Sequence, residues 1–178
     1  EGTTEALTSD YAYIMNDDGT ISVSGYTGSD TDLTVPGLID GYVVTGIADH
    51  AFEANADIKS ITLPNGLVTI GESAFSDCSS LTTVVIPDTV GTIRRGAFIS
   101  CTALTTLDIP ASVTEIMEET FTGCAALEDL TIESSTVEFT NWWVDTDEIP
   151  SGLTITCPKD SKIAAWAEKN NVATEPLS

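Results

Sequence analysis

Positively charged side chains are scarce in this chain of 178 residues, which has six lysines and arginines against 28 acidic residues. The formal net charge is −22 at pH 7. Six cations cannot form a basic stripe along a phosphate backbone. Nucleic acid is therefore excluded as a partner. An anionic bilayer surface is excluded by the same sign of charge. Because His50 is the only histidine, motifs that need two histidines are excluded as well.

Long apolar runs and catalytic motifs are also missing. No stretch of about 18 apolar residues occurs, so no membrane insertion is predicted. The first residues, Glu1 to Glu5, lack a basic region followed by an apolar one, so no signal peptide is expected in this chain. Nucleotide-binding glycine loops, C-x-x-C pairs and G-x-S-x-G turns do not occur. The sequence therefore predicts no enzyme, no cofactor and no metal site.

What the chain does contain is an internal repeat of 23 residues. Apolar residues make up 42% of the chain, enough to bury the core of one domain or one short solenoid. Four rows of identical residues share the same spacing, and they are Pro64, Pro87 and Pro110; Ile70, Ile93 and Ile116; Phe52, Phe75, Phe98 and Phe121; and Cys78, Cys101 and Cys124. Because four independent rows agree on one period, the repeat is a structural unit.

Each unit has the pattern of a short strand followed by a returning arm. Val84 and Ile86 alternate with polar or small residues, and Pro87 ends the strand by removing a ladder donor. A coil of this size cannot bury its own apolar side, so successive coils must stack. The sequence thus predicts a β-rich solenoid of about five to six coils with a parallel β-sheet. Its strands should end near the positions Pro36, Pro64, Pro87, Pro110, Glu133 and Pro158.

The consensus L-x-x-I-x-I-P-x-x-V-x-x-I-x-x-x-A-F-x-x-C-x-x-L resembles the BspA-like leucine-rich repeats of bacterial surface proteins. The resemblance implies a right-handed leucine-rich repeat superhelix over residues 33–158. It implies an N-terminal tail and capping hairpin over residues 1–32, and a capping helix and tail over residues 159–178. It also implies an extracellular or cell-surface protein with a role in adhesion or protein binding.

The repeat also predicts the environment of several polar positions. Stacked cysteines have parallel Cβ vectors, so Cys78, Cys101 and Cys124 should be buried free thiols and not disulfides. Asn55 begins the same row, where we expect it to donate hydrogen bonds to coil carbonyl groups. His50 aligns with small or polar residues and should lie in an exposed turn. The pair Arg94–Arg95 aligns with acidic residues of neighbouring units, which predicts charge pairing between coils.

Candidate partner-binding residues are those that stacking does not dictate, namely Tyr42, Asp108, Asp129, Trp142 and Trp143. Asp108 and Asp129 should lie on the exposed strand face. Adjacent residues of an extended chain point in opposite directions, so one tryptophan can close the core while the other faces outward. In the alternative, both tryptophans seal the irregular last unit.

Three functional hypotheses follow. The leading one is an extracellular protein-binding or adhesion module, monomeric, with a host matrix or cell-surface protein as its partner. A glycan-binding module and an inert spacer or display scaffold are the alternatives. Two acidic clusters, around Asp30 and Asp32 and around Asp145, Asp147 and Glu148, supply oxygen atoms for calcium. Neither cluster has the spacing of an EF-hand loop.

Overall fold

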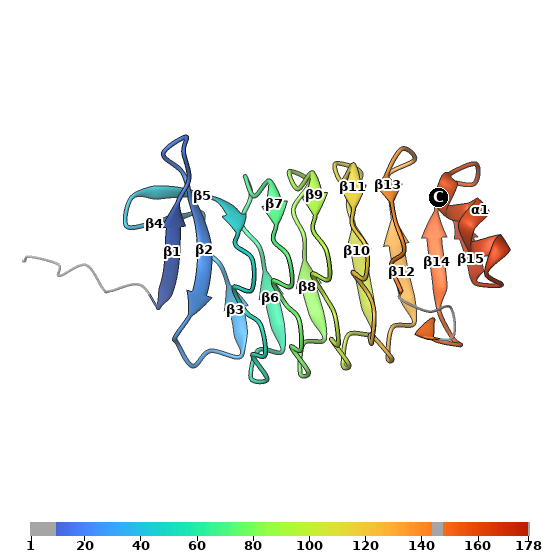
Figure 1. The fold of residues 1–178 in the computed structure, drawn as a ribbon, viewed down its shortest axis with the longest axis horizontal. Coiled ribbons are helices and arrows are strands. Elements are labelled where there is room, and N and C mark those ends of the chain that lie inside the picture. The colour runs from blue at the N-terminus through green and yellow to red at the C-terminus, as the bar shows by residue number, and fades with distance from the viewer. Residues whose placement is uncertain (1–9, 144–147, 178) are drawn as a thin grey trace, which may run out of the picture.

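The computed structural model describes residues 10–143 and 148–177 and is an elongated stack of coils (Figure 1). The strands of successive coils form two walls. The main wall consists of β3 (Asp32–Thr34), β6 (Ser60–Thr62), β8 (Thr83–Val85), β10 (Thr106–Ile109), β12 (Asp129–Ile132), β14 (Thr154–Cys157) and β15 (Ala173–Pro176). The second wall begins with β1 (Tyr11–Met15) and β2 (Ile21–Tyr26), and continues with β5 (Tyr42–Ile47), β7 (Thr69–Ile70), β9 (Thr92–Ile93), β11 (Glu115–Ile116) and β13 (Glu138–Phe139).

The spacing of the sequence repeat matches the register in which neighbouring strands pair. In the main wall Ser60 pairs with Thr83 and Thr106 pairs with Asp129, in parallel. In the second wall Thr69 pairs with Thr92 in the same way. Residues 23 apart are therefore neighbours on adjacent strands, as the repeat predicts. The ladder of the main wall is interrupted between β8 and β10, which lie side by side in separate sheets.

Phenylalanine rings form one buried column between the walls. Phe52 and Phe75 stack with ring centroids 5.3 Å apart, and Phe75 and Phe98 with centroids 5.4 Å apart. Phe121 continues the column at 6.4 Å from Phe98. Since each ring is contributed by one coil, stacking brings apolar surface together that no single coil could bury.

Two turn positions in each of four successive coils have left-handed backbone conformation, which explains their small or polar residues. The first row comprises His50 (φ 60°), Ser73 (φ 51°), Gly96 (φ 61°) and Glu119 (φ 62°). The second row comprises Ala54, Asp77, Ser100 and Gly123. A β-branched or bulky apolar residue would be strained here. His50 is exposed, so the prediction of an exposed turn is confirmed.

Two hairpins close the N-terminal end. The predicted capping hairpin is present as the antiparallel pair β1 (Tyr11–Met15) and β2 (Ile21–Tyr26). The five extra residues of the first unit form a second hairpin, in which β4 (Leu38–Ile39) pairs with β5. Asp40 and Gly41 form its turn and both have positive φ, as a two-residue turn of this twist requires.

A helix and one additional strand close the C-terminal end. Helix α1 (Lys162–Lys169) is capped by the Ser161 side chain, which accepts a hydrogen bond from the backbone N–H of Ala164. Ile163 and Ala167 are its buried residues, and Trp166 is half-buried. After the helix, β15 rejoins the main wall in parallel with β14. The chain therefore makes about seven turns, more than the predicted five to six, because the tail assigned to residues 159–178 contains this extra strand.

Candidate partner-binding surfaces

The outer face of the main wall is one continuous surface of short side chains. Its two rows are Asp32, Ser60, Thr83, Thr106, Asp129, Thr154 and Ala173, and Thr34, Thr62, Val85, Asp108, Thr131, Thr156 and Glu175. Asp108 and Asp129 are both exposed on it. They lie on neighbouring strands, because Asp108 pairs with Thr131 and Asp129 pairs with Thr106. Val85, also exposed, adds an apolar position near its centre.

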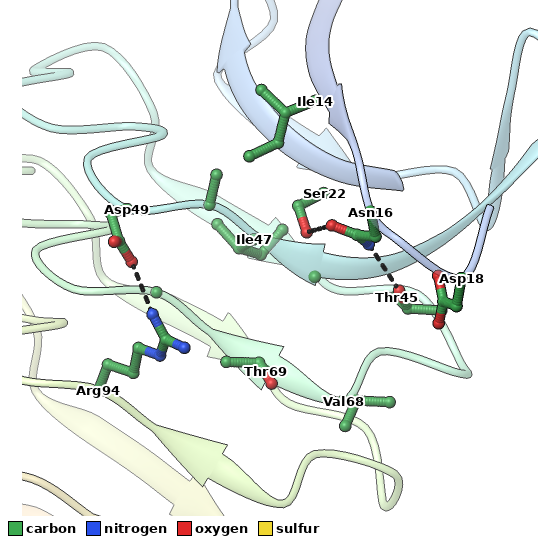
Figure 2. A pocket seen from close by; sticks show the side chains of 13 residues that line it. Ile14, Asn16, Asp18, Ser22, Thr45, Ile47, Asp49, Val68, Thr69 and Arg94 are labelled. Atoms are coloured by element: carbon green, nitrogen blue, oxygen red, sulfur yellow. Dashed lines mark hydrogen bonds and ion pairs between the residues drawn. The ribbon is translucent and has the colours of Figure 1, made fainter. Parts of the chain in front are cut away.

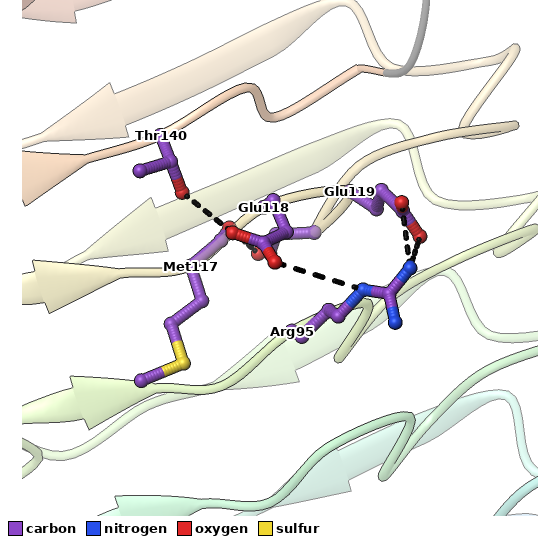
Figure 3. Close-up of polar contacts among 6 residues, drawn as sticks. Arg95, Met117, Glu118, Glu119 and Thr140 are labelled. Carbon is purple, nitrogen blue, oxygen red and sulfur yellow. Dashed lines mark hydrogen bonds and ion pairs between the residues drawn. The ribbon is translucent and has the colours of Figure 1, made fainter.

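This face has a uniform sign of charge. Its rows contain four carboxylates and neither lysine nor arginine. The arginines lie toward the second wall, where they are paired between coils. Arg95 donates to both oxygens of Glu119, at 2.8 and 2.9 Å, and lies 3.9 Å from Glu118 (Figure 3). Arg94 lies 3.5 Å from Asp49. The predicted pairing between coils is confirmed, and these cations do not neutralise the main-wall face.

Both tryptophans are buried, which is a correction to their assignment as contact residues. Trp142 is 1% exposed and Trp143 is 4% exposed. Trp142 meets Phe121 edge-on at 5.7 Å, and Trp143 stacks on Trp166 of the capping helix at 5.8 Å. The two rings therefore seal the irregular last unit against the helix. Both rings are buried because each packs on aromatic side chains, although the side chains of adjacent residues in a regular strand would point to opposite faces.

Tyr42 is the one predicted aromatic contact residue at the surface. It is 42% exposed at the start of β5. Its ring lies 6.1 Å from that of Tyr13 on β1, and the Tyr13 hydroxyl donates to Asp40 Oδ2 at 3.1 Å. These contacts place the β4–β5 hairpin against one side of β1.

A groove lies on the other side of β1 (Figure 2). Its volume is about 450 Å³, and Ile14, Asn16, Asp18, Thr45 and Val68 are among the residues that line it. The Asn16 amide nitrogen donates to the hydroxyl oxygens of Thr20 and Thr45, at 2.9 and 3.2 Å. The groove thus combines satisfied polar groups with the apolar side chains of Ile14 and Val68, both of which are exposed. Sequence periodicity did not indicate it, because the first hairpin is not part of the repeat.

The cysteine row has a structural hydrogen-bonding role. All four cysteines, Cys78, Cys101, Cys124 and Cys157, are free and buried. In the repeat each thiol donates to the phenylalanine carbonyl of the preceding coil, as from Cys101 to Phe75 at 3.1 Å. Burial raises the pKa of Cys78 and Cys124 to about 12 and also raises the pKa of Cys101. Such thiols are protonated and unreactive at neutral pH.

Asn55, at the start of this row, behaves differently from the prediction. Its side-chain oxygen accepts hydrogen bonds from the backbone N–H groups of Asp57 and Ile58, at 3.0 and 3.1 Å. It therefore closes its own turn as an acceptor, whereas we expected it to donate to coil carbonyls.

The acidic clusters give no assembled cation site in the described part of the chain. Over residues 10–143 and 148–177, no group of three or more His, Cys, Asp or Glu side chains is placed to hold a metal ion. Asp145 and Asp147 lie outside the described residues. Within the same ranges, no helix has the length and apolar character needed to cross a membrane.

Comparison with known proteins agrees with this architecture. The family model described as the BspA type leucine rich repeat region matches residues 44–151, in six copies. No curated protein sequence matches the chain significantly. A solved leucine-rich repeat protein of T. pallidum is 25% identical, with a TM-score of 0.76 over 86% of this chain and 71% of that one.

Two further solved structures are similar. A leucine-rich repeat protein from Bacteroides capillosus is 30% identical, with a TM-score of 0.63 over 70% of this chain and 95% of that one. A leucine rich cell surface protein from Faecalibacterium prausnitzii is 29% identical, with a TM-score of 0.61. That match covers 90% of this chain and 47% of that one.

Proposed function

We propose that this chain, which belongs to the BspA-type leucine-rich repeat family, is a non-catalytic protein-binding module of a secreted or cell-surface protein, with a role in adhesion. The location is supported by the similarity to a protein described as a leucine rich cell surface protein. The binding role is supported by the shape of the molecule, because a rigid stack presents an extended surface of the kind repeat proteins use to bind partners.

One observation supports the main-wall face as the binding surface. Asp108 and Asp129 are exposed on adjacent strands of a face that has carboxylates and no cations. A face of one charge sign steers a partner of the opposite sign and repels partners of its own. The partner class that fits is therefore a protein with a basic surface, and its affinity should fall as salt rises.

The glycan-binding alternative loses its main support in the structure. A sugar platform would need exposed aromatic rings, and an outward-facing tryptophan was the candidate. Trp142 and Trp143 are both buried, so neither can stack on a sugar. We therefore include a glycan panel in the binding test only for comparison with the protein probes.

The test is a binding screen of the purified chain against basic and acidic matrix proteins and a glycan panel, at low and high salt. The double variant Asp108→Asn/Asp129→Asn should weaken binding of a basic protein by about tenfold. The control Glu53→Gln/Glu168→Gln removes two exposed carboxylates away from this face and should leave affinity within about twofold. Equal losses in both variants would contradict the assignment of the face. If no probe bound, the spacer hypothesis would replace this one.

A further inference from the structure

The two walls have four outer ends, which differ in how the edge strand is covered, and the end at β1 is open among the described residues. An exposed sheet edge presents unpaired backbone groups to other chains, so proteins usually cover or interrupt it. At the second wall's C-terminal end, β13 is covered by α1, where Lys162 pairs with Glu138 and the Trp166 ring lies 6.5 Å from that of Phe139. At the main wall's N-terminal end, the Tyr11 hydroxyl donates to the Thr34 carbonyl of β3 at 3.2 Å.

At the main wall's C-terminal end, proline interrupts the edge. The backbone N–H of Leu177 donates to the Cys157 carbonyl, so alternate residues of β15, including Glu175, face β14. Pro176 then lies on the open side of the strand, where it lacks an N–H to donate. No further strand can form a regular ladder there.

Strand β1 is the end that has no such protection among the described residues. Among the described strands it pairs with β2 and is the last strand of its sheet. Across the hairpin, the N–H of Asn16 donates to Thr20 and the N–H of Thr27 donates to Asp10. Because an antiparallel ladder alternates inward and outward residues, Tyr13 and Met15 direct their backbone groups to the open edge. The extra residue of the bulge, Ser24, is on β2, so β1 is regular from Tyr13 to Met15.

The side chains around this edge are apolar. Ile14 and Met15 are each 53% exposed. Ile14 faces the groove described above, whereas Tyr13 contacts the β4–β5 hairpin through Tyr42. That hairpin, with Leu38 and Val43 also exposed, projects beyond β1 in Figure 1. An added strand would therefore meet apolar surface on both of its faces.

The charge around the edge is negative. Asp17, Asp18 and Asp40 are exposed close to β1, and no lysine or arginine precedes Lys59 in the sequence. Hydrogen bonds from Thr20 hold the pKa of Asp18 below its usual value, so its carboxylate stays charged. Arg94 lines the far part of the groove and is paired with Asp49. Pairing β1 with a second copy of the chain would bring these carboxylates together, which disfavours a dimer.

We propose that the open edge of β1 binds an extended segment of a basic protein, which adds to the second wall as a new strand. Backbone hydrogen bonds to Tyr13 and Met15 supply affinity, and alternating side chains supply specificity. The segment that fits alternates apolar residues, packed on Met15 and Tyr42, with lysine or arginine. The aliphatic stems of these cationic residues pack on Ile14 and their charged ends approach Asp18. This surface is separate from the main-wall face, so either can fail without the other.

The experiment uses a panel of synthetic seven-residue peptides that alternate valine, isoleucine or phenylalanine with lysine or arginine. Binding to the whole chain is followed by amide chemical shifts. Members of the panel should bind, shift the amides of Tyr13 and Met15, and leave those of Asp108 and Asp129 unchanged. Peptides with glutamate in place of lysine, or with N-methyl groups on alternate amides, should bind at least tenfold more weakly.

Matched variants test the backbone contact itself. Met15→Pro removes an N–H that points to the open edge, and should weaken binding about tenfold. Met15→Ala keeps the N–H but shortens a side chain that packs on the peptide, so it should weaken binding clearly less than Met15→Pro. Circular dichroism melts of both variants check the fold. Failure of the whole panel, or equal binding of the N-methylated peptides, would overturn the proposal. If the chain formed concentration-dependent dimers that Met15→Pro abolished, the proposal would be overturned, and the occupant of the β1 edge would be a second copy of the chain.

Discussion

The repeated middle of the molecule and its two ends differ in how their side chains pack. Between Phe52 and Phe121 the rings are nearly parallel, with interplanar angles of 5 to 9°. At the C-terminal end Phe121 meets Trp142 at 78°, and at the N-terminal end two hairpins replace the coil. In the middle, each residue is dictated by the coils on both sides. The ends have a neighbour on one side only, so their residues can serve capping and recognition.

The largest expected effect is the loss of a ring from the middle of the column. Phe98→Ala should lower the free energy of unfolding by about 3–5 kcal/mol, the usual range for a truncated buried aromatic residue. Phe139→Ala, at a half-buried ring near the end, should cost clearly less. Urea melts of both variants measure this difference. Equal costs, or the reverse order, would show that the middle is not held by its stacked rows.

The same contrast separates what the sequence could predict from what it could not. Spacing alone identified the Phe, Ile and Cys rows, because each repeated residue meets its own counterpart one coil away. Trp142 and Trp143 belong to none of these rows, so no row constrains them, and their burial depends on ring contacts with Phe121 and with Trp166 of the capping helix. Strand β15 could not be predicted, because it follows a helix and its residues do not lie one repeat length after those of β14. Asn55 replaces a cysteine, and its role depends on a local turn that no repeat reveals.

A smaller effect is expected for the thiols of the middle coils. Cys101→Ala removes the hydrogen bond to the Phe75 carbonyl and should cost about 1 kcal/mol. Burial raises the pKa of Cys78 and Cys124 to about 12, so their stabilising contribution is complete below the ordinary thiol pKa. It is lost as the pH rises from about 9 to 12, because the unfolded state then releases protons that the folded state retains. Melts across this range should show stability falling, less steeply for Cys78→Ala.

The ion pairs on the outside of the coils should contribute less. Arg95 is exposed, and its pairs with Glu118 and Glu119 lie in solvent. Arg95→Gln should therefore lower the free energy of unfolding only slightly in low salt. The difference from the unmodified chain should shrink in high salt. A large loss that does not depend on salt would indicate a packing role for this side chain.

The smallest effect is expected at the left-handed turn row. His50 is exposed, and its ring Nδ1 lies 3.0 Å from Oε2 of the exposed Glu53. His50→Ala should change stability by no more than about 0.5 kcal/mol. His50→Gly should be no worse than His50→Ala, because glycine adopts its positive φ without strain. A marked preference for alanine in thermal melts would contradict this backbone assignment.

The most direct test of the coil as the structural unit is the removal of one coil. Deleting residues 82–104 takes out one period and joins Leu81 to Thr105, which preserves the register of every remaining row. The shortened chain should unfold cooperatively in urea with a reduced free energy of unfolding. It should also keep a β-rich circular dichroism spectrum and the affinity of the β1 edge. Deleting residues 82–101 breaks the register and should prevent folding. If both deletions were equally unfolded, or equally tolerated, the period would not be the unit on which the molecule is built.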